Sequence, residues 1–386
     1  MRIKAAVLDG PNREFTIEPL ELDPPGPGEV LVKMVATGVC HSDIHVITGD
    51  LKRPFPVVLG HEGAGIVQKV GKGVTAVQKG DHVILTFLPA CGKCHWCHTG
   101  QPNMCDLGAL LRTGRMLDGT TRLHRKDGSE VSNFLFVSTW ATHSVVPEAS
   151  LVKVPEYIRL ERACLLGCGF TTGFGAATNA VHIRPGETAT IVGCGGLGLA
   201  AVQGARMSGA GKIIAVDVHP EKLAMAKAFG ATHGVLNPHD PDAVIAQIMD
   251  ITWGLGTDFS FEFVGFDQAM ETLSIAFRAI RKGGTMCLVG VGSSQFETLP
   301  IDPYTLTLWR KKVQGVLFGD AQFQWDIPKY VRLFEEGRIN LDAMVTKEFQ
   351  LDDINTCIEN VLAGNRVARQ VIRFDCAMRR SAQTKD

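Results

Sequence analysis

The sequence predicts an α/β protein of two domains, in which a mostly β domain is followed by a doubly wound parallel sheet. Three observations support this fold class. The chain has 386 residues, which is more than one hydrophobic core usually serves. Its N-terminal part, up to Cys168, is dense in short β-rich runs that Gly and Pro interrupt. After Cys168 the pattern becomes an apolar strand, a Gly turn, an amphipathic helix and another strand, repeated to about residue 317.

In the N-terminal part, β-branched and apolar runs predict strands at Ile3–Leu8, Val30–Val35, Gly65–Val70, His82–Phe87 and Leu151–Val154. In the second part, apolar runs predict buried parallel strands at Thr188–Val192, Lys212–Asp217, Phe259–Val264 and Thr285–Val291. Helical periods lie between these strands, at Leu197–Ser208, Pro220–Phe229 and Gln268–Ala279. Two later helical runs, near Ile327–Glu336 and Leu351–Leu362, are expected to pack back on the first domain. The expected domains are therefore 1–169 with 318–386, and 170–317.

Composition excludes several classes of function. The formal net charge is −1, so no basic face for nucleic acid is expected. No apolar run has the length of a membrane span, and the start MRIKAAVLDG lacks the layout of a signal peptide. We therefore expect a cytoplasmic protein with no membrane partner. In a chain of that kind, eleven cysteines favour ligands, catalysis or small core residues over a disulfide framework.

Four cysteines recur within the segment CGKCHWCHTGQPNMC, at Cys91, Cys94, Cys97 and Cys105. Closely spaced C-x-x-C turns direct thiolates to one point, as a tetrahedral zinc ion requires. The same cysteines could instead be free core thiols or paired disulfides. A site with four sulfur ligands has no open position for a substrate, so it predicts a structural zinc and indicates no activity.

The second part contains a dinucleotide-binding pattern. The glycine-rich turn follows the strand TATIV and opens a helix, as a pyrophosphate site requires. Asp217 ends the next strand, where a carboxylate can accept hydrogen bonds from both hydroxyls of the adenosine ribose and repel a 2′-phosphate. The pattern therefore predicts NAD rather than NADP. The residues of the turn are Gly193, Gly195, Gly196, Leu197 and Gly198.

Three further residues are of the types that bind zinc. Cys40 lies in GVCHSDIH, His61 in GHEGAG and Cys168 in LLGCGFTTGFG. A metal ion with one open position can lower the pKa of a hydroxyl group and so promote dehydrogenation of an alcohol. Spacing alone cannot bring these three positions together. They are equally consistent with two buried cysteines and a core histidine.

Taken together, these motifs resemble the zinc-dependent alcohol dehydrogenases of the medium-chain dehydrogenase/reductase superfamily. The segment GHEGAG with Gly71 and Val74 matches the zinc signature of the family, and the four-cysteine segment has its spacing. LLGCGFTTGFG and MLDGTTR resemble the class I and class III members, and the match covers residues 1–374. The resemblance implies a GroES-like catalytic domain, a Rossmann domain and two zinc ions per subunit. It also implies that the catalytic zinc is bound by Cys40, His61 and Cys168.

The resemblance also implies roles for residues around the zinc and the cofactor. Asp43 would accept the other ring N–H of His61, and Glu62 would lie behind the metal. Ser42 would take the substrate proton and His45 would pass it to solvent. Each of these four residues could instead be an ordinary surface or loop residue. The implied cofactor contacts are His41 and Arg369 to the pyrophosphate, Lys222 to the ribose and Thr172 to the nicotinamide.

The positions that line the substrate pocket of the family are occupied here by apolar residues, which suit a primary aliphatic or aryl alcohol or its aldehyde. An alternative function is that of a thiol-dependent formaldehyde dehydrogenase, which acts on a glutathione or mycothiol adduct. Against this alternative, Gly108 occupies the position where such enzymes carry an arginine. Two further alternatives are a zinc-free, crystallin-like nucleotide-binding protein and an enzyme that never releases its NAD. The long loop 106–132 resembles a loop of the dimeric members of the family, and the resemblance therefore implies a homodimer rather than a tetramer. The expected pocket residues are Phe87, Leu110, Phe134, Leu135 and Val291.

Overall fold

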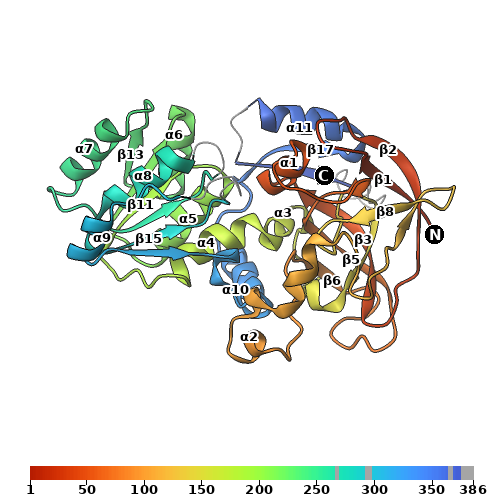
Figure 1. Ribbon diagram of the computed structural model, residues 1–386. Coiled ribbons are helices and arrows are strands. Elements are labelled where there is room, and N and C mark those ends of the chain that lie inside the picture. Colours follow the sequence, from red (N-terminus) through yellow and green to blue (C-terminus); the bar gives the residue numbers. More distant parts are fainter. Residues whose placement is uncertain (266–268, 292–297, 364–367, 375–386) are drawn as a thin grey trace, which may run out of the picture.

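The chain forms two lobes that lie side by side (Figure 1). The computed structural model describes residues 1–265, 269–291, 298–363 and 368–374. The N-terminal lobe is rich in β-strands, and a parallel sheet with its helices forms the second lobe. In the described residues, no helix has both the length and the apolarity that crossing a membrane requires.

The N-terminal lobe contains a closed barrel and a mixed sheet. The barrel has the order β1-β2-β7-β8-β4, and the sheet has the order β10-β6-β5-β3-β18-β17, with β9 paired to β3. The barrel strands are β1 (Arg2–Leu8), β2 (Thr16–Leu22), β4 (Val57–Val58), β7 (Leu123–His124) and β8 (Glu130–Asn133). The strands of the mixed sheet are β3 (Glu29–Gly38), β5 (Glu62–Val70), β6 (His82–Leu85), β9 (His143–Pro147), β10 (Leu151–Val154), β17 (Val345–Gln350) and β18 (Arg369–Arg373).

The second lobe is a six-stranded parallel sheet of order β13-β12-β11-β14-β15-β16. The order reverses between β11 and β14, and ligands of such sheets bind at the carboxyl ends of the strands at this point. Its strands are β11 (Thr188–Val192), β12 (Lys212–Asp217), β13 (His233–Leu236), β14 (Thr257–Glu262), β15 (Ile280–Leu288) and β16 (Lys312–Gly315). The helices of this lobe are α5 (Gly196–Met207), α6 (Pro220–Phe229), α7 (Pro241–Ile251), α8 (Ala269–Ala279) and α9 (Pro303–Leu308).

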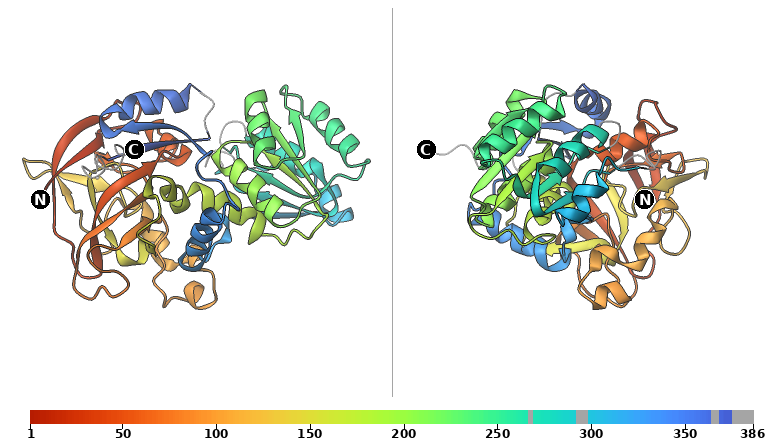
Figure 2. Two further views of the ribbon diagram at one scale, coloured as in Figure 1. Left: turned by 180° about the vertical axis from the view of Figure 1, so that it is seen from behind. Right: turned by 60° about the vertical axis from the view of Figure 1, so that its left-hand side comes forward.

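One of the hydrophobic core clusters extends across both lobes. Buried side chains form a continuous cluster from Ala36 and Ala64 of the mixed sheet to Ile191 and Ala215 of the parallel sheet. The helix α4 (Gly169–Thr178) connects them, and it packs against α5. The helix α10 (Phe323–Glu335) lies between the lobes in the left view of Figure 2 and contacts β10. This core fixes the position of α4, whose first turn faces the site described below.

The remaining helices are short. The α-helices are α1 (His41–Ile47), α2 (His95–His98), α3 (Leu160–Ala163) and α11 (Ile354–Leu362). Turns of 3-10 helix are η1 (Pro102–Met104), η2 (Asp106–Arg112), η3 (Glu148–Ser150), η4 (Cys164–Gly167), η6 (Phe318–Asp320) and η7 (Leu351–Asp353).

The predicted fold class is confirmed, with differences at the level of single elements. The first two predicted parallel strands have the predicted limits. The elements that were not predicted from the sequence include β13, a short strand that contains Gly234, and α7, which begins after the N-cap Asp240. The side chain of Asp240 accepts hydrogen bonds from Asp242 N and Ala243 N, which is a local signal for a helix start. Of the helix predicted over Gln268–Ala279, Gln268 lies outside the described residues.

Candidate active site and cofactor cleft

Three buried side chains that are distant in the sequence meet where the two lobes join. Cys40 is the N-cap of α1, His61 directly precedes β5, and Cys168 is the N-cap of α4. Their exposed fractions are 5%, 1% and 7%. Together with a carboxylate oxygen of Glu62, one ligand atom from each lies within 4.8 Å of all the others. Two thiols, an imidazole and a carboxylate at this spacing form a donor set that suits zinc.

Asp43 orients the histidine of this cluster. Its Oδ1 lies 3.1 Å from His61 Nδ1, and both side chains are buried. The same carboxylate accepts hydrogen bonds from Gly60 N and Cys40 N, each at 3.1 Å. Because a carboxylate can only accept here, Nδ1 carries the proton and Nε2 retains its lone pair for a metal.

Glu62 and Arg369 lie behind the cluster and are both buried. Glu62 Oε1 accepts a hydrogen bond from Gly169 N at 3.0 Å and lies 3.4 Å from Arg369 Nη2. Its Oε2 is buried without a hydrogen-bond partner, and burial raises the pKa of this carboxyl group to about 7. A hydrogen bond from Cys168, together with the charges of His61 and Arg369, lowers the pKa of the Cys40 thiol. An unpartnered buried oxygen beside an acidified thiol fits a bound cation.

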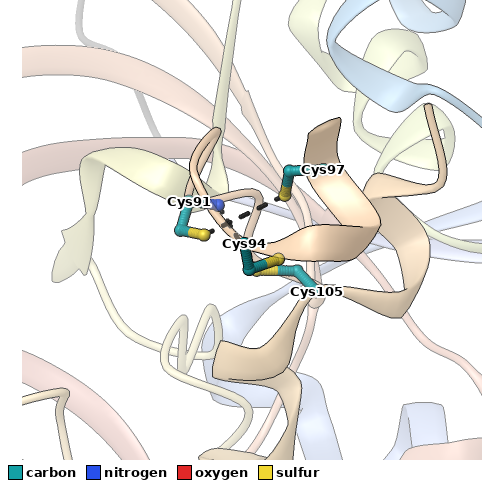
Figure 3. A group of neighbouring side chains, drawn as sticks. All are labelled: Cys91, Cys94, Cys97 and Cys105. Atoms are coloured by element: carbon teal, nitrogen blue, oxygen red, sulfur yellow. Dashed lines mark hydrogen bonds between the residues drawn. The ribbon is translucent and has the colours of Figure 1, made fainter. Parts of the chain in front are cut away.

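The four cysteines of the segment around α2 form a separate group (Figure 3). One sulfur from each of Cys91, Cys94, Cys97 and Cys105 lies within 4.8 Å of the other three. Cys91 Sγ is 4.0 Å from Cys97 Sγ, and Cys91 N donates to Cys105 Sγ at 3.4 Å. Hydrogen bonds from the backbone of Asp106 and Cys97 lower the pKa of Cys94 to about 6, whereas burial raises the pKa of Cys97 to about 12.

The glycine turn lines a cleft of about 260 Å³ between the lobes. Gly193 has φ +90°, and a Cβ at Gly198 would collide with the carbonyl oxygen of Gly193, so both positions require glycine. Asp217 Oδ2 accepts a hydrogen bond from Cys194 N at 2.8 Å, and Lys222 Nζ lies 3.9 Å from Asp217 Oδ1. The carboxylate thus lies at the glycine turn that precedes α5, as a ribose contact requires.

This cleft brings most of the expected cofactor and relay residues together. Thr172 differs from the others, since its hydroxyl donates to Cys168 O at 2.9 Å and it is not among the residues that line the cleft. Burial lowers the pKa of His41, which favours the neutral ring. The expected residues that line the cleft are Cys40, His41, Ser42, His45, Gly193, Gly195, Gly196, Leu197, Gly198, Asp217, Lys222, Val291 and Arg369.

The two expected relay residues lie on one turn of α1. Ser42 Oγ lies 3.8 Å from Cys40 Sγ, and the rings of His45 and His41 are 6.5 Å apart. His45 Nδ1 is 3.3 Å from Asp50 Oδ2, a contact that was not predicted from the sequence. Asp50 also accepts a hydrogen bond from Thr48 at 2.7 Å, which fixes the carboxylate beside the imidazole.

Of the expected substrate-pocket residues, two contact His61 directly. The ring of Phe87 lies 5.8 Å from that of His61, and the ring of Phe134 lies 5.6 Å from it. Leu135 is buried in the core of the N-terminal lobe and has φ +51°. Leu110 is 38% exposed and is not packed in either core cluster around Phe87, whereas its neighbour Leu111 is packed against both.

Several residues of the site were not predicted from the sequence. Phe318 lies with its ring 4.9 Å from Phe87, and Phe263 and Val264 line the cleft after β14. A buried aromatic in a turn between the two lobes gives no local signal. The position of Phe263 was in principle predictable, because it follows a parallel strand next to the point where the strand order reverses.

The fold and the site define a medium-chain dehydrogenase with a GroES-like lobe. Residues 26–156 match the alcohol dehydrogenase GroES-like domain, and residues 196–336 match the zinc-binding dehydrogenase domain. The chain belongs to the alcohol dehydrogenase family of zinc-binding dehydrogenases.

Several named relatives align with nearly the whole chain. An NDMA-dependent alcohol dehydrogenase of Amycolatopsis methanolica is 41% identical over 95% of this chain and 98% of its own. Alcohol dehydrogenase B of Mycobacterium tuberculosis is 40% identical over 97% of this chain and 99% of its own. The crystal structure of benzyl alcohol dehydrogenase from Acinetobacter calcoaceticus has a TM-score of 0.90 at 34% identity, over 97% and 100% of the two chains. These similarities establish the chain as an oxidoreductase of the alcohol dehydrogenase type.

Proposed function

We propose that this protein interconverts primary alcohols and aldehydes with NAD as hydride acceptor and a catalytic zinc bound by Cys40, His61 and Cys168. One observation carries the proposal. Donor atoms of these three buried residues lie within 4.8 Å of one another, and the cleft that contains the glycine turn opens on Cys40. A cation site next to a dinucleotide site is the arrangement that alcohol oxidation needs.

Zinc in this site would supply Lewis acidity, which lowers the pKa of the substrate hydroxyl. Side chains of the protein orient the zinc ligand, transfer the proton and exclude water. Asp43 holds His61 in the tautomer whose Nε2 is free. Ser42 accepts the hydroxyl proton, and His45, oriented by Asp50, passes it to solvent. Phe87 and Phe134 exclude water from the hydroxyl end of the substrate.

NAD is proposed as the cofactor because the carboxylate of Asp217 lies at the glycine turn that precedes α5. A 2′-phosphate would bring negative charge against it, since the only cation within 4.0 Å in the described chain is Lys222. A zinc-binding dehydrogenase from Sinorhizobium meliloti, 25% identical, was solved with NADP, so a protein of this fold can also bind NADP. His41 and Arg369 are proposed to bind the pyrophosphate, and Thr172 the nicotinamide.

A second, structural zinc is proposed at Cys91, Cys94, Cys97 and Cys105. Four sulfurs fill all four positions of a tetrahedral ion, so this zinc would stabilise the segment without reacting. The proposed stoichiometry is two zinc ions per chain.

The test is a scan of primary alcohols and aldehydes with NAD or NADH, together with metal analysis of the purified protein. We expect turnover of aliphatic and aryl alcohols, about two zinc ions per chain and a preference for NAD over NADP. Bound dinucleotide without zinc and without turnover would instead favour a zinc-free, crystallin-like protein. Formaldehyde oxidation that depends on glutathione or mycothiol would favour a thiol-dependent formaldehyde dehydrogenase, against which Gly108 argues.

A second candidate is an enzyme that retains its NAD and passes electrons to an external acceptor. It is favoured by one observation, the name of the Amycolatopsis methanolica relative, which states a dependence on NDMA. Denaturing the purified protein and assaying for released NAD(H) separates the two candidates. Turnover with NDMA alone, with stoichiometric NAD(H) released on denaturation, would favour the second.

We also propose that the protein is a homodimer. In the described chain β16 pairs only with β15, which leaves one edge of the parallel sheet open. Tyr304 and Leu308 of the neighbouring helix α9 are 68% and 61% exposed. An open edge with exposed apolar side chains beside it suits pairing with a second copy. Light scattering at micromolar concentration gives the mass that tests this.

A further inference from the structure

Arg53 lies at the far end of a row of rings that begins at His61. The ring centroids of His61 and Phe134 are 5.6 Å apart, and Arg53 Cζ lies 5.8 Å from the centroid of Phe134, over its ring. Since His61 belongs to the proposed zinc site, Arg53 is separated from that site by the width of one aromatic side chain. A substrate whose hydroxyl group is at the zinc could place its opposite end near Arg53.

The guanidinium group of Arg53 is only partly satisfied by the protein. Nη1 donates to Lys52 O at 2.8 Å, but Nε is buried and has no hydrogen-bond partner in the described structure. Burial lowers the pKa of Arg53, and the positive charge of Arg112 lowers it further. A buried donor without a partner costs free energy, and an anionic ligand would remove that cost.

A second arginine reinforces this positive charge. Arg112 ends η2, and the next turn contacts the segment of Arg53, because a Cβ at Gly114 would lie 3.1 Å from Pro54 Cγ. The nearby carboxylates are engaged elsewhere. Asp50 pairs with His45, and Glu130 pairs with Arg115 at 2.6 Å. Within residues that the structure describes, neither Arg53 nor Arg112 has an acidic side chain within 4.0 Å.

We infer that Arg53, supported by Arg112, binds a carboxylate of the substrate. The inference rests on the proposed function and names its substrate class: primary alcohols, and their aldehydes, that carry a carboxylate at the end opposite the hydroxyl group. The apolar middle of such a molecule suits Phe87 and Phe134, and a guanidinium group binds a carboxylate through two parallel hydrogen bonds. The carboxylate can belong to a small aryl alcohol or to the carrier of a thiol adduct.

The test compares two substrates of nearly equal shape, 4-(hydroxymethyl)benzoate and 4-methylbenzyl alcohol, at saturating NAD. The measured quantity is the ratio of their kcat/KM values, which does not depend on how much of a variant is folded. We expect the wild type to favour the anionic alcohol and Arg53→Met to lower the ratio about ten- to a hundredfold, with a smaller loss in Arg53→Lys. Arg115→Met, which removes a neighbouring arginine that is already paired, is the matched control and should leave the ratio unchanged.

A ratio that is the same in the wild type and in Arg53→Met overturns the inference, and so does an equal drop in Arg115→Met, which would indicate only a general field effect. Turnover of the neutral alcohol in that case shows that the proposed function stands, whereas failure of the wild type on both alcohols contradicts the proposed function itself. Formaldehyde oxidation is measured with and without glutathione in parallel. Stimulation by glutathione that is lost in Arg53→Met identifies a thiol carrier as the source of the carboxylate.

Discussion

Asp43 Oδ1 accepts a hydrogen bond from His61 Nδ1 at 3.1 Å, and neither side chain is accessible to solvent by more than 1%. The contact links the first turn of α1 to the residue before β5, so it fixes one proposed zinc ligand relative to another, Cys40. Because Asp43 also accepts hydrogen bonds from two backbone N–H groups, its carboxylate cannot rotate away. The imidazole therefore has one tautomer and one orientation.

Asp43→Asn should weaken zinc binding at the catalytic site about ten- to a hundredfold, because an amide nitrogen or oxygen cannot accept from all three donors. The measurement is zinc retained after dialysis against a chelator, together with kcat. Asp23→Asn is the matched control, since Asp23 pairs with His124 at 2.9 Å in a part-exposed Asp–His contact outside the cluster. Equal zinc retention by the two variants would contradict the role of Asp43.

Cys168→Ser should abolish turnover and remove one zinc per chain, while NAD still binds, because the glycine turn does not depend on the N-cap of α4. Metal analysis and a fluorescence titration with NADH measure the two effects. Cys164→Ala changes a buried cysteine that lies one turn earlier and serves as control. Full activity of Cys168→Ser would remove this residue from the catalytic site.

Cys94→Ser should act on stability rather than on chemistry. Cys94 belongs to the separate four-cysteine group, and loss of one ligand weakens the proposed structural zinc. We expect a lower melting temperature, faster loss of zinc and near-normal kcat for the molecules that remain folded. A normal melting temperature with lost activity would reverse the roles assigned to the two cysteine sites.

Asp217→Asn should raise KM for NAD about tenfold or more and narrow the preference for NAD over NADP, since a charge-assisted hydrogen bond to the ribose is replaced by a neutral one. The carboxylate also accepts from Cys194 N and His219 N, so the melting temperature is measured as well. An unchanged ratio of kcat/KM for NAD and NADP would contradict the proposed ribose contact.

The lowered pKa of Lys311 should make the stability of the folded protein depend on pH, independently of the zinc sites. Burial lowers its pKa to about 8 from 10.5, although Nζ donates to Phe277 O at 2.9 Å. The folded protein therefore loses this proton at a lower pH than the unfolded chain does. Below pH 8 the buried charge lowers the stability of the folded protein, and this loss of stability decreases as the pH rises toward 10.5. Lys311→Met should be more stable than wild type at pH 7, and the difference in melting temperature should shrink by pH 9.5. A constant difference over this range would contradict the shift.

Local patterns in the sequence predicted local structure well. The strands on both sides of the glycine turn, the turn itself and the four-cysteine group each depend on residues within a short segment, where periodicity and spacing are informative. Cys40, His61 and Cys168 come from three elements, and no spacing rule joins them. Only the resemblance to a family suggested that they meet, and their separation of less than 4.8 Å depends on tertiary packing.

The substrate end of the site was the least predictable. Leu110 and Leu111 are both apolar, and a one-residue difference in the phase of η2 decides which of them packs inward. The contact of Arg53 with Phe134 joins two loops, and the position of Phe318 depends on how the lobes are joined. Contacts between loops leave no periodic pattern in a sequence.

The most direct test of the catalytic zinc site is an anomalous difference map at the zinc edge from crystals of the active protein. We expect a peak about 2.0–2.3 Å from Cys40 Sγ, His61 Nε2 and Cys168 Sγ, in addition to one among the four cysteines Cys91, Cys94, Cys97 and Cys105. An active crystal with density only at the four-cysteine group would contradict the catalytic zinc site.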